Sequence, residues 1–143
     1  MYYFAYGSNM NKDWFKTRCP YAKPIAGPFY LENSQFIYDG ESSQWNNKAV
    51  ANIISRQNSK VWGGLYEILS NDLDNLDHHE GYPNNYGKGI VIVKDKNKKE
   101  YPAWVYYRVG QKEGLPSDDY KKCVLKGAKD FNLPEEYITK NLI

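Results

Sequence analysis

The start of the chain is its most constraining stretch, because Tyr2-Tyr3-Phe4-Ala5-Tyr6 runs directly into Gly7-Ser8-Asn9. Five consecutive aromatic or small apolar residues predict a strand that is buried on both faces. Glycine accepts backbone angles closed to other residues, and Ser and Asn form short hydrogen bonds, so the strand should end in a tight polar loop. Asn11 can cap a helix that begins directly afterwards. This layout directs backbone N–H groups to one point and favours an anionic ligand. The alternative is an ordinary turn after a buried strand.

The remaining pattern predicts a sheet-rich domain. Strands are expected at 29–39, 49–55, 61–68, 86–94 and 100–107, helices at 13–17, 70–80, 117–131 and 134–142, and loops at 20–28, 40–48 and 114–116. The elements do not alternate regularly between strand and helix, which favours an α+β fold with a mostly antiparallel or mixed, barrel-like sheet. The length of 143 residues fits a single domain over 1–143. Gly63-Gly64 inside a strand predicts a bulge, a sharp bend or a close approach of backbone or ligand.

The helix expected at 70–80 carries an acidic residue on its apolar face. Leu73, Leu76 and Glu80 are spaced i, i+3, i+7, which places Glu80 on the stripe that faces the sheet. Ser70 or Asn71 can cap the start of this helix, and Gly81 can cap its end. Burial and the helix dipole should both raise the pKa of Glu80, and the neighbouring Asp77 on the same stripe should push the pKa of one of the two carboxyls further up. A carboxyl tuned in this way suits general acid–base catalysis near neutral pH. The alternative is that the end of the helix is exposed and Glu80 points into solvent.

The candidate metal ligands do not form a recognisable motif. His78 and His79 are adjacent on the helix, so their side chains diverge by about 100° and cannot share one ion. Cys19 and Cys123 are far apart and lack the spacing of a metal or redox motif. We therefore expect no metal ion and two reduced thiols.

The charge pattern argues against a nucleic-acid partner. The net charge is +2 with scattered lysines, and the densest basic stretch, 94–99, contains Asp95. No apolar run reaches transmembrane length, and no signal peptide precedes the first strand. We expect a cytoplasmic protein with no membrane partner and leave its oligomeric state open between monomer and homodimer.

Four blocks of the sequence resemble the γ-glutamylcyclotransferase family. They are Tyr3-Phe4-Ala5-Tyr6-Gly7-Ser8-Asn9-Met10, the stretch 61–68, Leu76-Asp77-His78-His79-Glu80-Gly81 followed by Tyr86, and the C-terminal stretches 116–122, 127–129 and 133–137. The blocks follow the family's order along almost the whole chain. The stretch between Gly81 and Tyr86 departs from members that act on glutathione or simple γ-glutamyl dipeptides, so the resemblance leaves the leaving group open.

The resemblance implies a fold, an activity and a partner. The fold would be a small α+β domain with a mixed, partly closed β-barrel and flanking helices. The activity would convert a small γ-glutamyl compound to 5-oxoproline without metal or organic cofactor, as the substrate's own α-amine attacks its γ-carbonyl and expels an amine or amino acid. Because nucleophile and electrophile belong to one molecule, the enzyme needs only a folded substrate conformation, a proton shuttle and charge stabilisation.

The resemblance also assigns roles to individual residues. Glu80 would be the catalytic acid/base. The backbone amides of Gly7 and Ser8 would hold the glutamyl carboxylate or the developing oxyanion, Asn9 would brace the turn, and Gly63 and Gly64 would let a strand approach the ligand. The full set of implied substrate-binding residues is Tyr3, Phe4, Ala5, Tyr6, Gly7, Ser8, Asn9, Tyr86 and Tyr120.

Alternatives exist at the level of residues and of function. Tyr120 could be a core aromatic, and Gly63 and Gly64 could form a plain bulge. The chain could be a non-catalytic module that binds a γ-glutamyl or amino-acid ligand, although a binding site gains little from a carboxyl on an apolar helix face. It could also bind single-stranded nucleic acid on an aromatic barrel face, although the scattered lysines argue against this.

Overall fold

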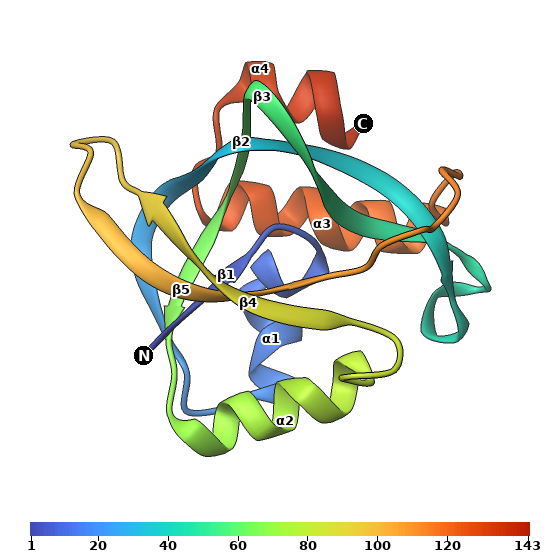
Figure 1. Cartoon of the computed structure of the whole chain (residues 1–143), viewed down its shortest axis with the longest axis horizontal. Coiled ribbons are helices and arrows are strands. Elements are labelled where there is room, and N and C mark those ends of the chain that lie inside the picture. The colour runs from blue at the N-terminus through green and yellow to red at the C-terminus, as the bar shows by residue number, and fades with distance from the viewer.

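Two long strands and three shorter ones form a closed barrel in the computed structural model, which describes all residues from 1 to 143 (Figure 1). The strands are β1 (Tyr2–Ala5), β2 (Lys23–Ser42), β3 (Lys48–Glu67), β4 (Gly87–Lys94) and β5 (Glu100–Tyr107). Their order around the barrel is β1-β3-β2-β4-β5. All neighbours are antiparallel except β1 and β5, which are parallel and pair Tyr3 with Trp104. The predicted α+β class with a mixed barrel is confirmed, and the barrel closes where partial closure was expected.

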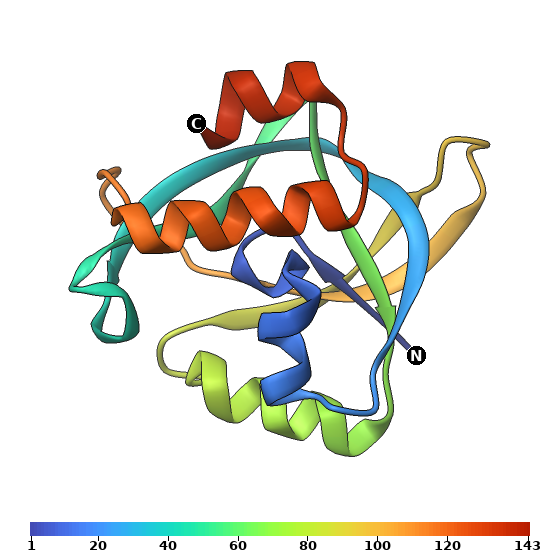
Figure 2. The ribbon, with the colours of Figure 1, turned by 180° about the vertical axis from the view of Figure 1, so that it is seen from behind.

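Helices cover the outside of this barrel. A short 3₁₀ helix, η1 (Ser8–Met10), leads into α1 (Lys12–Arg18), and α2 (Ser70–Glu80) follows β3. The C-terminal helices are α3 (Asp118–Asp130) and α4 (Glu135–Tyr137), which continues as the π-helical turn η3 (Ile138–Leu142). Figure 2 shows α1 and α3 on the same side of the barrel, with α2 and α4 at opposite ends. None of the helices combines the length and the apolar composition that crossing a membrane requires.

The long hairpin of β2 and β3 differs from the prediction. Residues 23–28 belong to β2 and were predicted as a loop, and β3 is one strand of 20 residues where two were predicted. Pro28 is tolerated in β2 because the pairing with β3 shifts register between Ile25 and Phe29, where ladder hydrogen bonds are interrupted. Most of the middle of β3 is polar and exposed, so no apolar alternation marks it as strand.

The glycine pair in β3 allows two close contacts within the protein. A side chain at Gly63 would collide with the carbonyl oxygen of Ala5 in β1, and one at Gly64 would collide with the ring of Phe131. Phe131 is 1% exposed and packs against Tyr66 with ring centroids 5.4 Å apart. The predicted close approach therefore brings β3 against the backbone of β1 and against a core aromatic ring, and not against a ligand site. Neither glycine lines the cavity described below.

Hydrogen-bonded caps define where α1 and α2 begin and where α2 ends. Asn11 caps α1 as predicted, accepting a hydrogen bond from the N–H of Trp14 at 3.1 Å. The N-cap of α2 is Leu69, and not Ser70 or Asn71, because the carboxylate of Asp72 reaches back to accept from the Leu69 N–H at 2.9 Å. Gly81 ends α2 with φ +67°, so Glu80 is the last helical residue, as predicted.

Helix α3 lies directly on the loop that follows β1. Gly127 makes this approach possible, because a Cβ there would collide with the backbone N of Asn11 and lie 2.5 Å from the backbone carbon of Met10. Ser117 caps the other end of α3 by accepting from the Tyr120 N–H at 3.2 Å. The loop after β1 is therefore held between the barrel and a long, well-capped helix.

Candidate active site

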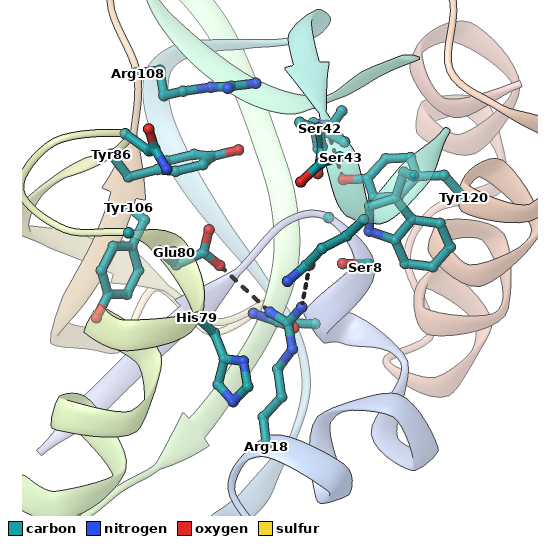
Figure 3. A pocket seen from close by; sticks show the side chains of 18 of the residues that line it. Ser8, Arg18, Ser42, Ser43, His79, Glu80, Tyr86, Tyr106, Arg108 and Tyr120 are labelled. Carbon is teal, nitrogen blue, oxygen red and sulfur yellow. Dashed lines mark hydrogen bonds and ion pairs between the residues drawn. The ribbon is translucent and has the colours of Figure 1, made fainter. Parts of the chain in front are cut away.

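A cavity of about 420 Å³ lies where the end of β1, the end of α1 and the last turn of α2 meet the hairpin tip between β2 and β3 (Figure 3). Its wall is rich in tyrosine and contains the charged residues Arg18, Glu41, Glu80 and Arg108. Among its lining residues are Tyr3, Tyr6, Gly7, Ser8, Asn9, Arg18, Gln44, His79, Glu80, Tyr86, Tyr106, Arg108 and Tyr120.

Glu80 points into this cavity and not into solvent. Its side chain is only 17% exposed, and the nearest cation is Arg18, whose Nη1 lies 3.8 Å from Oε1 of Glu80. Burial raises the pKa of Glu80 above its ordinary value, while the charges of Arg18 and Arg108 pull the pKa back down. The predicted rise in the pKa of Glu80 through burial is confirmed, and the contribution of the helix dipole stays a prediction.

The predicted influence of Asp77 on Glu80 is wrong. The Asp77 carboxylate faces β4 and β5, where it accepts hydrogen bonds from the Tyr106 hydroxyl at 2.6 Å and from Lys88 Nζ at 2.7 and 2.9 Å. Lys88 neutralises this carboxylate, and Asp77 is not among the groups that shift the pKa of Glu80. Asp77 instead fastens the last turn of α2 to the barrel, which fixes the position of Glu80.

The loop after β1 lines the cavity with residues whose backbone amides have no backbone partner. The Gly7 N–H donates no hydrogen bond to another backbone group. Ser8 begins the 3₁₀ helix, and the first N–H groups of a helix have no partner inside it. Position 7 requires glycine for space, because a Cβ there would lie 2.8 Å from the Cβ of Ala51 and 3.0 Å from the Tyr120 hydroxyl oxygen.

Asn9 connects this loop to the charged wall. Its side-chain nitrogen donates to the Tyr3 hydroxyl at 2.9 Å, and its side-chain oxygen accepts from Nη1 of Arg18 at 3.4 Å. Its backbone carbonyl accepts from the Tyr66 hydroxyl at 2.8 Å. With three buried partners, Asn9 has the contacts that a bracing residue needs.

Two residues of the predicted substrate segment lie elsewhere. Phe4 and Ala5 are 0% and 1% exposed and do not line the cavity, because both side chains pack in the core. We therefore assign them a packing role in place of the predicted substrate contact. Tyr3, Tyr6, Gly7, Ser8 and Asn9 from the same segment do line the cavity.

The tyrosines of the wall are neutral hydrogen-bonding groups. The Tyr6 hydroxyl donates to the backbone carbonyl of Tyr106 at 2.6 Å, and the Tyr120 hydroxyl accepts from the N–H of Ala51 at 2.9 Å. Burial raises the pKa of Tyr6, Tyr86 and Tyr120 above the ordinary value, and the charge of Glu80 raises all three further. Tyr120 packs in the core and also lines the cavity, and its contact with substrate stays a prediction.

Sequence reasoning did not identify Arg18, Arg108 or Gln44. Arg18 is only 8% exposed, and its Nη2 donates to Oε1 of Gln44 at 3.0 Å. It is the last residue of the short helix α1, directly before Cys19-Pro20, a position with no signal of burial. Arg108 directly follows β5, and its position at the end of a strand was the only available indication.

The two histidines of α2 lie at the edge of the same cavity. The rings of His78 and His79 are 5.9 Å apart, and burial, then Arg18 and His78, lower the pKa of His79. No group of three or more His, Cys, Asp or Glu side chains is gathered closely enough to hold a metal ion.

Comparison with known proteins places the fold and the sequence among characterised relatives. Residues 60–141 match the model of the AIG2-like family. The chain is 33% identical to the γ-glutamylcyclotransferase of Homo sapiens and 30% identical to that of Mus musculus, in each case over 96% of this chain and 75% of the relative. A solved structure described as γ-glutamyl cyclotransferase has a TM-score of 0.92 with this chain at 28% identity, covering 98% of this chain and 85% of that one.

Proposed function

Because this chain belongs to the γ-glutamylcyclotransferase family, we propose that it is an enzyme that converts a γ-glutamyl-amino acid or γ-glutamyl-amine to 5-oxoproline and the free amino acid or amine. The observation that carries the proposal is that Glu80, a buried carboxyl of raised pKa, lines the same cavity as Gly7 and Ser8, whose backbone N–H groups have no backbone partner. A site that only bound its ligand would gain little from a carboxyl whose charge is disfavoured by burial. The relatives named as cyclotransferases also weigh against the alternative of a non-catalytic binding module.

The first step forms the five-membered ring. Glu80, ionised, takes a proton from the substrate's α-ammonium, and the resulting amine attacks the γ-carbonyl carbon. A carbon–nitrogen bond forms, and the carbonyl electron pair moves onto the oxygen. The N–H groups of Gly7 and Ser8, which line the cavity, would hold the negative charge that develops there or the glutamyl carboxylate beside it.

The second step expels the leaving group. Protonated Glu80 gives its proton to the leaving nitrogen, the bond between that nitrogen and the carbonyl carbon breaks, and the carbonyl re-forms. The ring nitrogen, which bonded to the carbon while still carrying two hydrogens, gives its extra proton to the released amine, which departs as an ammonium ion. Glu80 is then ionised again, so the cycle is balanced within the protein and the substrate. A pKa raised by burial makes Glu80 a better base than an exposed carboxylate and a competent acid in the return step. No cofactor is needed for this sequence, and we propose that the enzyme works without one in the cytoplasm.

A direct assay tests the proposed activity. The purified protein should release 5-oxoproline and an equimolar amount of amine from at least one member of a panel of γ-glutamyl-amino acids and γ-glutamyl-amines. Chromatography with mass detection measures both products. Thermal stabilisation by such compounds without any product would support the binding-module alternative instead.

Removing Arg18 should shift the pH dependence of the reaction. Glu80 must be ionised to accept the substrate proton, so kcat/KM should rise with pH through the pKa of Glu80. The Arg18 charge lowers that pKa, so Arg18→Met should move the acidic limb of the kcat/KM profile to higher pH and reduce activity most at low pH.

The pH profile also separates this electrostatic effect from simple structural damage. Arg56→Met is the matched control, because Arg56 is an exposed residue whose side chain contacts Gln35 on the long hairpin. The control should keep the acidic limb where the unmodified protein has it. An unshifted limb in Arg18→Met would show that Arg18 does not set the pKa of Glu80.

A further inference from the structure

Arg108 is a cation in the cavity wall without a carboxylate partner. None of the ion pairs in the protein includes it, whereas Arg18 on the other side of Glu80 has Glu80 itself at 3.8 Å. The Arg108 Nε atom is buried and makes no hydrogen bond. No carboxylate is in ion-pair contact with this partly buried guanidinium, and the charges of Glu80 and Asp39 act on it only at longer range. An anionic ligand in direct contact would therefore stabilise it.

The position of Arg108 is fixed before any ligand binds. Its backbone N–H donates to Oδ1 of Asn52 at 3.0 Å, and its carbonyl accepts from Nδ2 of the same side chain at 2.9 Å. The guanidinium donates to the backbone carbonyls of Glu41 at 3.2 Å and Asp39 at 3.4 Å. Its carbon lies 4.8 Å from the centre of the Tyr86 ring. Fixing both backbone and side chain in this way lowers the entropy cost of recognising a ligand.

A glycine in the adjacent strand β2 makes room for the guanidinium. Gly40 has φ +63°, and a Cβ there would lie 2.8 Å from the Arg108 Cζ and closer still to Nη2. A guanidinium has five N–H donors, and the two carbonyls engage one donor on each terminal nitrogen. Donors on the terminal nitrogens therefore remain for a ligand in the cavity that Arg108 lines.

Arg18 and Arg108 lie at opposite ends of the cavity. Figure 3 shows them on opposite sides of Glu80, with Tyr86 between Glu80 and Arg108 and with Ser42 and Ser43 beyond the guanidinium of Arg108. In the proposed reaction both the attacking and the leaving nitrogen must reach Glu80. The loop amides and Arg18 occupy the end that suits the glutamyl carboxylate, which leaves the Arg108 end for the leaving group.

We propose that Arg108 is a specificity-determining residue that binds an anionic group on the leaving amine, namely the carboxylate of a leaving amino acid. This inference rests on the proposed cyclotransferase function and narrows its substrate class. The enzyme then favours γ-glutamyl-amino acids over γ-glutamyl-amines that lack a carboxylate.

A matched pair of substrates tests this assignment. γ-Glutamyl-alanine and γ-glutamyl-alaninamide differ only in a terminal carboxylate or carboxamide. The unmodified protein should show a kcat/KM about 10- to 100-fold higher for the acid, the range expected for one charge-assisted hydrogen bond. Most of the difference should lie in KM, because the carboxylate contact is present in the ground state and in the transition state.

Variants of Arg108 supply the second arm of the test. Arg108→Met should bring the ratio of the two kcat/KM values close to one, and Arg108→Lys should retain part of the preference because it keeps the charge but loses the planar fork. Arg56→Met should retain the full ratio. A ratio that stays high in Arg108→Met, or that is near one in the unmodified protein, overturns the assignment.

A measurement on the unmodified enzyme tests the assignment even if Arg108→Met does not fold. Alanine should inhibit the unmodified enzyme at a concentration about tenfold or more below that of alaninamide, because it carries the carboxylate. Equal inhibition by both overturns the assignment of Arg108. If neither γ-glutamyl compound nor any other in the panel yields 5-oxoproline, the proposed function itself fails, which is a distinguishable result.

Discussion

Glu80→Gln should lower kcat by about two to four orders of magnitude, the contribution typical of a positioned general acid–base. The amide keeps the shape of the carboxyl and can still fill the end of α2, but it cannot take a proton from the α-ammonium. Steady-state release of 5-oxoproline measures the loss. Binding should persist, because the loop amides and the two arginines remain in the cavity. Thermal stabilisation by substrate checks that retained binding.

The stability of Glu80→Gln is part of this prediction. The charge of Glu80 is disfavoured by burial, so the neutral amide should change the free energy of unfolding by no more than about 1 kcal/mol. Asp74→Asn is the matched control, since Asp74 lies on the exposed face of the same helix. It removes a similar charge and should leave kcat within about twofold, as for an ordinary surface substitution. Wild-type kcat in Glu80→Gln would exclude Glu80 as the acid/base.

Gly127→Ala should destabilise the protein by about 1 to 3 kcal/mol, even though alanine is the better helix former. In an isolated helix the change would stabilise by up to about 1 kcal/mol. Here the added methyl group would meet the backbone of Met10 and Asn11, and backbone atoms cannot turn aside as a flexible side chain can. Either α3 moves outward or the loop after β1 shifts, so chemical denaturation should show a lower midpoint.

The same substitution should reduce catalysis, because the displaced loop contains the amides of Gly7 and Ser8. A loss of kcat/KM in protein that is still fully folded at the assay temperature is the expected result. Gly89→Ala is the control, since its nearest neighbour is a ring atom of Tyr107 at an ordinary 3.9 Å. A Gly127→Ala variant as stable and active as the unmodified protein would mean that this contact between helix and loop is not tight in solution.

The elements that could be predicted from the sequence are those that carry their own pattern. The first strand and its loop follow from an apolar run ended by Gly7-Ser8-Asn9, and the burial of Glu80 follows from its spacing to Leu76. The length of β2 and β3 could not be predicted, because the exposed middle of the hairpin is polar and resembles a loop. The cap at Leu69 depends on Asp72 reaching back, which residue type alone does not reveal.

The charged wall of the cavity was missed for a different reason. Arg18 and Arg108 are separated by most of the chain, and the fold brings both into the cavity of Glu80, where their charges lower its pKa. Nothing in the local sequence of either arginine distinguishes a buried guanidinium from an exposed one. Asp77 shows the opposite error. Its spacing predicted a position beside Glu80, but its carboxylate forms hydrogen bonds with Lys88 and Tyr106 on the barrel. Residue spacing predicts the face of a helix, and tertiary partners decide where the side chain points.

The parallel pairing of β1 with β5 has a consequence for the order of folding. The first strand pairs with β3 on one side and with β5 on the other, and the second pairing joins residues about one hundred positions apart. Contacts so distant in sequence carry a high loop-closure entropy and form slowly. A nascent chain therefore has to hold its first apolar strand unpaired on that side until β5 has been synthesised. The loop that shares the cavity with Glu80 is ordered only when this strand is in place, so catalytic competence should arise with the last closure of the barrel and not before.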